Sequence, residues 1–200
     1  MATRPTPISV AVEGPVDEAV ARRIIFEIGG SPGLTYGRLG KANLRDRIEG
    51  FNHAAARSPW FVLVDLNHEE CAPVLYGTWL PRPAAKMCLR VAIREVESWL
   101  LADREEIARF LGVAVARITR DPESLDDPKQ TLVDVARRSR LRAIREDLVP
   151  RPGSGREVGP AYTARMAEYV ASTWRPEIAA GAAASLRRCL ERVSALVDGP

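Results

Sequence analysis

The stretch that decides the fold covers residues 8–25 and reads ISVAVEGPVDEAVARRII. Its first five residues, Ile8–Val12, are mostly apolar, as expected of a short strand. Glu13 and Gly14 end that run, and Pro15 followed by two acids is typical of the first turn of a helix. The sequence therefore predicts a strand, a sharp turn and a helix, with the carboxylate of Glu13 at the turn. Ligands of open α/β sheets bind at this edge.

Two further segments resemble strands of the same kind. Residues 60–66, WFVLVDL, are apolar on both faces, as in a buried strand of a parallel sheet, and residues 87–93 are a third candidate. No convincing strand follows residue 112. We expect helices over residues 16–28, 41–56, 74–80, 94–103, 105–111, 128–138, 161–173 and 180–196, and loops over 29–33, 37–40, 121–127 and 150–160.

This order, strands with helices and then helices alone, predicts an α/β fold. We expect a mostly parallel sheet flanked by helices in residues 1–112, and a helical C-terminal region in residues 113–200 that packs on this core. A chain of 200 residues with 46% hydrophobic content is long enough for one such domain with a helical extension.

The charge is modest, with a formal net charge of +3, and arginine carries most of the positive charge. Lysine occurs only at Lys41, Lys86 and Lys129. Arginine binds phosphate bidentately, so the composition permits a nucleic-acid partner. The arginine and alanine bias of a GC-rich genome explains the same composition equally well.

The three cysteines, Cys71, Cys88 and Cys189, are far apart and form no C-x-x-C pair, which argues against a zinc site. Free thiols are typical of a reducing compartment. No apolar run approaches the ~18 residues that a bilayer requires, and the first residues lack a signal-peptide core. We therefore expect a cytoplasmic protein without a membrane partner.

Acids follow all three predicted strands: Glu13, Asp65, and Glu95 with Glu97. If the strands are parallel neighbours, these carboxylates meet at one edge of the sheet. Converging hard oxygens bind Mg²⁺ or Mn²⁺, whereas without a cation they repel one another and raise each other's pKa. A single acid after a strand is often only a helix cap or a turn residue, and this simpler interpretation stands for each acid alone.

Four segments of the chain resemble a known family. Glu13-Gly14 with Asp17-Glu18 is similar to the first signature of Toprim domains, and Asp65-Leu66-Asn67 to their Asp-x-Asp signature with the second acid replaced. Residues 94–103, REVESWLLAD, resemble a run found in a bacterial family of small Toprim-like proteins of unknown function, which is related to the nuclease half of OLD-type systems. A Pro-Lys pair that opens a later helix in that family matches Pro128-Lys129.

The resemblance implies a role for each matching residue. Glu13 is implied as the general base or a metal ligand, Asp65 as a ligand, and Glu95 or Glu97 as completing the site. Lys129 is implied to offer positive charge to a phosphate or to the transition state. Asn67 replaces an acid, so a metal here would be held by less charge, although an amide oxygen still coordinates.

The resemblance implies a Mg²⁺- or Mn²⁺-dependent, Toprim-like protein that cleaves phosphodiesters in nucleic acid, as the effector of an ATPase-coupled bacterial defence system. The alternative is a non-catalytic partner subunit of an AAA- or ABC-type ATPase with a degenerate metal site. A homo-oligomer is compatible with either. The arginine-rich segment around Arg137, Arg138 and Arg142 is a candidate nucleic-acid surface, and a solvated helix face explains it as well.

Overall fold

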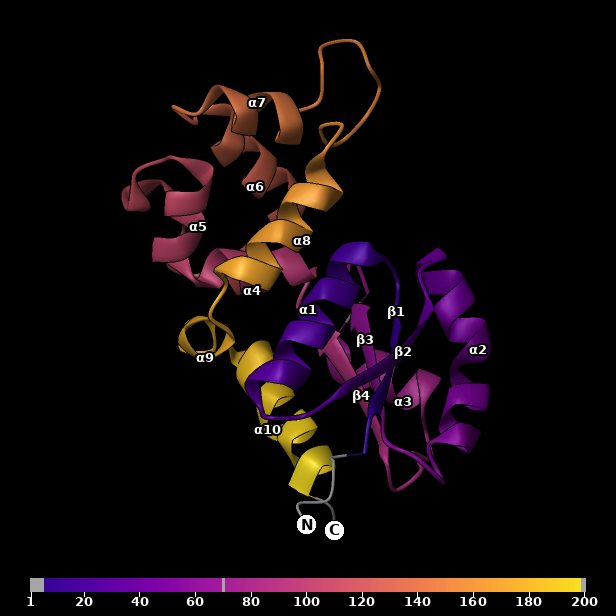
Figure 1. Cartoon of the computed structure of the whole chain (residues 1–200). Helices are drawn as coiled ribbons and strands as arrows, with labels where there is room; N and C mark the ends of the chain where they lie inside the picture. The colour runs from indigo at the N-terminus through magenta and orange to yellow at the C-terminus, as the bar shows by residue number, and fades with distance from the viewer. Residues whose placement is uncertain (1–5, 70, 199–200) are drawn as a thin grey trace.

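Four parallel strands form one sheet in the computed structural model, which describes residues 6–69 and 71–198 (Figure 1). The strands are β1 (Ile8–Val12), β2 (Pro32–Gly37), β3 (Trp60–Asp65) and β4 (Met87–Ala92), in the spatial order β2-β1-β3-β4. Every pairing is parallel. The predicted α/β class, with a mostly parallel sheet flanked by helices and followed by C-terminal helices, is confirmed.

Helices cover both faces of this sheet, because a parallel strand buries both of its sides. On one face α1 (Pro15–Glu27) and α10 (Ala184–Asp198) share a core with Val10, Phe61 and Cys88. On the other face α2 (Gly40–Ala54) and α3 (Ala72–Trp79) pack with Val62 and Leu89. Figure 1 shows the last helix of the chain beside the first, so the C-terminal part completes one layer of the fold.

The remaining helices form a lobe at and beyond the carboxyl ends of the strands, and the last of them joins this lobe to α10 (Figure 1). They are α4 (Val96–Ala102), α5 (Arg104–Leu111), α6 (Pro128–Arg137), α7 (Arg142–Leu148), α8 (Tyr162–Ser172) and α9 (Pro176–Ala179), with short 3₁₀ turns at Val115–Arg117 and Pro122–Ser124. The fully buried Trp99 donates its indole N–H to Ser185 Oγ at 2.7 Å, and Trp174 donates to the carbonyl of Trp99 at 3.2 Å. The first bond ties the lobe to α10 in the sheet layer, and the second holds two segments of the lobe together. The division of the chain at residue 112 stays a prediction.

One strand was not predicted. β2, with the sequence PGLTYG, lies at the edge of the sheet beside β1 and is only partly buried. Its two ends fall in the predicted loops over residues 29–33 and 37–40, and residues 34–36 between them were assigned to no element. An edge strand needs no continuous apolar run, because one side faces solvent, and its glycines and proline resemble a loop. This explains why the sequence signal is weak there.

Gly37 ends β2 with φ +86, and a Cβ at this position would lie 2.3 Å from the carbonyl oxygen of Val12. We expect Gly37→Ala to lower the free energy of unfolding by about 3 kcal/mol, from the left-handed backbone and the backbone clash together. Gly40 has φ +83 but open space around it. Gly40→Ala should therefore cost only about 1 kcal/mol. Equal losses of stability for the two variants in urea unfolding would show that the close approach of Gly37 to Val12 contributes nothing.

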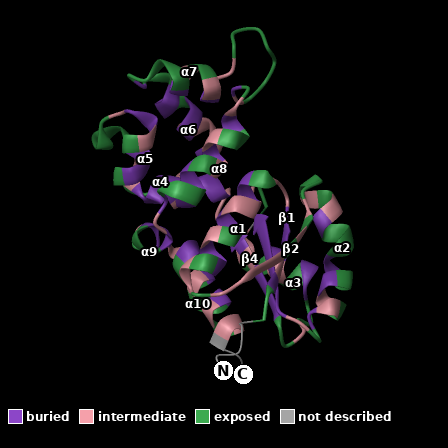
Figure 2. Cartoon of the chain, viewed as in Figure 1, coloured by how far each residue is buried: buried purple, intermediate pink, exposed green. Residues whose placement is uncertain are grey.

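Several boundaries differ from the prediction. Residues 94 and 95 were expected inside a helix, but Arg94 has φ +59 and Glu95 is extended, so that α4 begins only at Val96. The short helices α7 and α9 were not predicted. Residues 150–160 form no helix or strand, as expected, and most of this loop is exposed, as the green segment in Figure 2 shows. No helix in the part of the chain that the structure describes is long and apolar enough to cross a membrane.

Candidate functional site

The chain reverses its direction of travel across the sheet between β1 and β3, since β2 lies on one side of β1 and β3 on the other. Such a switch point opens a crevice at the carboxyl ends of the two strands, where ligands bind. Glu13 directly follows β1 and Asp65 is the last residue of β3. Glu13 Oε1 accepts a hydrogen bond from the backbone N–H of Asp65 at 2.9 Å. The two acids that the sequence singled out therefore meet at this point.

Two aspartates are buried beside the switch point. Asp65 Oδ1 accepts a hydrogen bond from the N–H of Val96 at 2.9 Å, which fixes the start of α4 against β3. Asp17 lies in the first turn of α1, where the positive end of the helix dipole favours an acid. Gly14 precedes this turn, and a Cβ there would lie 3.1 Å from Asp17 Oδ2. Both aspartate residues are only 7% exposed, so their charges are poorly solvated.

Glu97 is the third buried acid, with 2% exposure. Its Oε1 accepts a hydrogen bond from the hydroxyl of Tyr162 at 3.0 Å. Its Oε2 is buried and has no hydrogen-bond partner among the described residues. A buried carboxylate oxygen without a donor is costly, so this atom calls for a proton or a cation.

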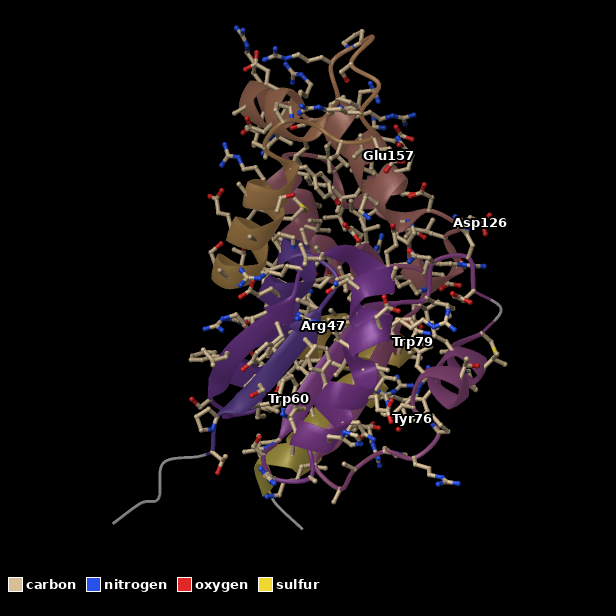
Figure 3. The ribbon with its side chains drawn as sticks, turned by 90° about the vertical axis from the view of Figure 1, so that its right-hand side faces the viewer. Arg47, Trp60, Tyr76, Trp79, Asp126 and Glu157 are labelled. Carbon is tan, nitrogen blue, oxygen red and sulfur yellow. The ribbon has the colours of Figure 1, made fainter. Side chains whose placement is uncertain are left out.

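A cavity of about 220 Å³ lies between these groups. Its wall includes Asp17, Asp65 and Glu97, which we call the acid triad, together with Lys129 and Tyr162. Glu157, labelled in Figure 3, contributes from the exposed loop of residues 150–160. The wall of this one cavity is therefore built from strand β3, from helices α1, α4, α6 and α8, and from this loop.

Lys129 is the cation of the cavity. Its Nζ lies 2.8 Å from Glu95 Oε1 and 3.8 Å from Glu97 Oε1. The backbone N–H of Lys129 also donates to Glu95 Oε2 at 3.0 Å, at the N-terminus of α6. Glu95 thus uses both carboxylate oxygens on Lys129, and it positions the lysine more than it offers a free ligand.

Burial raises the pKa of every acid in the triad. Desolvation and then the neighbouring charges of Glu97 and Glu13 raise the pKa of Asp17 to about 7. Desolvation and the charge of Asp17 raise the pKa of Asp65 well above its usual value. The pKa of Glu97 is also raised, mainly by burial, although Lys129 lowers it. At neutral pH Asp17 is therefore only partly ionised, and a cation that compensates the charge of the triad would favour the ionised form of all three acids.

Two other groups complete the electrostatics. Burial raises the pKa of Glu13, while the hydrogen bond from Asp65 and the charge of Lys41 oppose the shift. Burial lowers the pKa of Lys129, but Glu97 and Glu95 outweigh this effect, so its net pKa is raised and the ammonium stays charged.

The structure brings together Glu13, Asp65, Glu95, Glu97 and Lys129, all of which the sequence had proposed as site residues. Asn67 is placed differently. It adopts φ +54 in the turn after β3, where its N–H donates to the carbonyl of Arg94 at 2.7 Å and its own carbonyl accepts from Arg94 Nη1 at 2.9 Å. Like Glu13 and Glu95, it is not part of the cavity wall. The observed contacts of Asn67 therefore support a turn.

Sequence reasoning assigned no role in the site to Asp17, Lys41 or Tyr162. Asp17 was visible in the first signature, but its position one helical turn after Glu13 was interpreted as helix-start chemistry. Lys41 Nζ donates to the carbonyls of Asp65 and Leu66 at 2.8 and 3.1 Å. Tyr162 reaches Glu97 from a helix 65 residues away in sequence. No local sequence pattern predicts a contact between residues so far apart in the chain.

The side chains of the acid triad have the right chemistry to bind a hard divalent cation, but in this structure they are not arranged to hold one. The acid triad supplies carboxylate oxygens, including the unpaired Oε2 of Glu97, and these are the ligands that Mg²⁺ and Mn²⁺ prefer. Among residues 6–69 and 71–198, no group of three or more His, Cys, Asp or Glu side chains is arranged so that it could hold a metal ion. A cation would have to draw these carboxylates closer together.

The three arginines proposed for nucleic acid lie outside the cavity. Arg137, Arg138 and Arg142 are exposed at the end of α6 and the start of α7. Arg142 Nε lies 2.7 Å from Glu146, and Arg137 Nη2 lies 3.8 Å from Asp134. At the rise of an α-helix, Arg137 is about 12 Å from Lys129 along α6. The spacing allows an extended ligand to reach both places.

Comparison with known proteins gives no match: no family model, no curated protein and no solved structure matches this chain.

Proposed function

We propose that the acid triad binds Mg²⁺ or Mn²⁺ and that the chain is a Toprim-like protein that cleaves phosphodiesters in nucleic acid. The observation that supports this best is the unpaired, buried Oε2 of Glu97 beside two further buried aspartates. The acids lie at the switch point of the sheet, and a lysine stands next to them. The family resemblance supplies the reaction class, and an ATPase-coupled defence system is its implied setting.

In this proposal Asp17, Asp65 and Glu97 hold the cation. A bound divalent cation would neutralise charge on a phosphate and lower the pKa of water. Glu13 is the candidate base, because the bond from Asp65 uses only its Oε1 and burial raises its pKa. Lys129, held by Glu95, offers a fixed positive charge to a phosphate.

Cleavage should depend on the triad. We expect Asp65→Asn and Glu97→Gln each to lower Mn²⁺- or Mg²⁺-dependent cleavage of DNA or RNA by about a hundredfold or more, because each removes one of the three carboxylates proposed to hold the cation. Labelled single-stranded and duplex DNA and RNA are the substrates, with a chelator as the blank. The matched control is Glu49→Gln, which removes an exposed acid on α2 and should leave cleavage unchanged.

Metal binding is measured separately by titrating Mn²⁺ into the wild type and into Asp65→Asn by calorimetry. The proposal requires binding that the substitution weakens by about tenfold or more. Unchanged cleavage in both acid variants, with folded protein, would contradict it.

The arginines give a second, independent expectation. If Arg137, Arg138 and Arg142 each neutralise a phosphate, replacing all three by alanine should lower the slope of log K against log salt for single-stranded nucleic acid by about two. The control replaces Arg45, Arg47 and Arg57, which are exposed around α2; Arg47 is labelled in Figure 3. An equal change in slope for both variants would show that the affinity is diffuse and that no arginine surface exists on α6 and α7.

A second candidate is a non-catalytic partner subunit of an AAA- or ABC-type ATPase. The observation in its favour is the place of Asn67, a turn residue where the resembled signature has an acid, together with the lack of a preformed ligand set in the described residues. Co-purification with an ATPase, with no Mn²⁺ binding and no cleavage, would favour this candidate over the enzyme.

A further inference from the structure

A second cavity, of about 580 Å³, lies along the free edge of the sheet. It runs between α3 and α10, with strand β4 as its floor, and it shares no lining residue with the acid cavity. Tyr76, labelled in Figure 3, and Pro73 contribute from α3, and Arg188 and Arg192 contribute from α10. We call this cavity the edge groove.

The floor of the edge groove is an unpaired strand edge. β4 pairs only with β3 among the strands of the described structure. The N–H of Trp60 bonds to the carbonyl of Lys86, and the N–H of Leu66 bonds to that of Ala92, so the even-numbered residues of β4 direct their main chain toward β3. Since direction alternates along a strand, the main-chain groups of Leu89 and Val91 face the groove. An unpaired edge of this kind accepts an added strand. Leu89 and Val91 are only 1% and 7% exposed, so the added strand must displace the side chains that cover them.

The two walls of the groove differ in chemistry. On the α3 side the wall is apolar, with Tyr76, Leu89 and Val91 packed in one core. On the α10 side it is cationic. The charged lining residues on this side are one acid, Glu191, and three arginines, Arg90, Arg188 and Arg192. None of these arginines forms an ion pair within the described residues. The buried Nε of Arg90 lacks any hydrogen-bond partner there.

We propose that the edge groove binds an extended segment of a partner protein in which acidic and apolar side chains alternate. The segment adds to β4 through its main chain, because Leu89 and Val91 offer donors and acceptors. Its apolar side chains lie against Tyr76, and its carboxylates lie against the arginines, since a strand directs successive side chains to opposite faces. A second copy of this chain fits less well, because a symmetric β4 pairing would bring arginine-rich α10 faces toward each other.

The probe is a fluorescein-labelled peptide of about eight residues in which Glu and Val alternate. Fluorescence anisotropy should show saturable binding to the full chain. A peptide of the same composition, with Glu and Val in two blocks, should bind about tenfold more weakly. N-methylation of the peptide residues that pair with β4 should weaken the binding of the alternating peptide by about the same factor, because it removes main-chain N–H donors without changing the charge.

On the protein, Arg188→Glu combined with Arg192→Glu should weaken the binding of the alternating peptide by about tenfold or more. The matched control is Arg187→Glu, an exposed neighbour on α10 that does not line the groove and should leave affinity unchanged. No binding would overturn the proposal. Equal binding of the block peptide, or an N-methylated peptide that binds as well, would also overturn it and would show that the arginines hold only a small anion or a diffuse charge.

Discussion

Replacing Asp17 by asparagine should raise the free energy of unfolding of the metal-free protein at pH 8 by about 3 kcal/mol. The pKa of Asp17 rises from 3.8 to about 7 on folding, mainly through burial and then through Glu97 and Glu13. A shift of this size corresponds to about 4 kcal/mol of destabilisation once the carboxylate must ionise, and partial relaxation lowers the figure. Asparagine is nearly isosteric and carries no charge.

The sign of the pH dependence follows from the same shift. Between pH 4 and pH 7 the folded protein binds more protons at Asp17 than the unfolded chain, so wild-type stability falls as the pH rises. The advantage of Asp17→Asn should be near zero below pH 4, should grow through this window and should be complete above pH 7. Urea unfolding at several pH values measures it. Asp46→Asn, on the exposed face of α2, is the control and should change nothing.

Magnesium should reduce this advantage of Asp17→Asn. If the acid triad holds a cation, saturating Mg²⁺ stabilises the wild type at pH 8, by about 2.7 kcal/mol at a hundredfold excess over Kd, and stabilises Asp17→Asn less. A pH profile that is the same for the wild type and Asp17→Asn would contradict the buried, charged cluster itself. An intact pH effect with no response to Mg²⁺ or Mn²⁺ would keep the cluster and remove the metal from the proposal.

The strongest strands were predictable because they are buried on both faces. WFVLVD is an apolar run that ends in an acid, and β3 is buried throughout its length. β2 carries the opposite signal, since an edge strand with Gly33 and Gly37 has little to bury. The order β2-β1-β3-β4 is not written in any local pattern either, because it depends on which face each crossover helix covers.

The candidate site was predictable as far as it follows strand ends. Glu13 and Asp65 were identified in this way, and the structure places them in contact. Glu95 followed the same rule, but its extended backbone turns it toward Lys129. The buried partner of Glu97 is Tyr162, whose position depends on how α8 crosses α1 and α4. Sequence spacing does not predict that packing, so Tyr162 was not predicted as a site residue.

Replacing Lys129 by methionine should lower the free energy of unfolding at pH 8 by about 3 kcal/mol. Lys129 is the only cation within 4 Å of Glu95 and Glu97 in the described structure, and its loss leaves two poorly exposed carboxylates uncompensated. The loss should shrink as the pH falls and Glu97 binds a proton, because burial raises the pKa of Glu97. In the wild type, the raised pKa of Lys129 adds stability that persists below its usual value of 10.5 and disappears only as the pH rises further.

The control is Lys86→Met. Lys86 is exposed, and in the described structure its side chain bonds only to the carbonyl of Arg57, so the loss of stability should stay within about 0.5 kcal/mol. The Lys129→Met variant also separates two roles of Lys129. Because its ammonium competes with any other cation for Glu97, Lys129→Met should bind Mn²⁺ more tightly than the wild type. If Lys129 also offers charge to a phosphate, cleavage should nevertheless fall. Tighter Mn²⁺ binding with unchanged cleavage would make Lys129 a counter-ion of the acids alone, and weaker Mn²⁺ binding would argue that it positions the ligands.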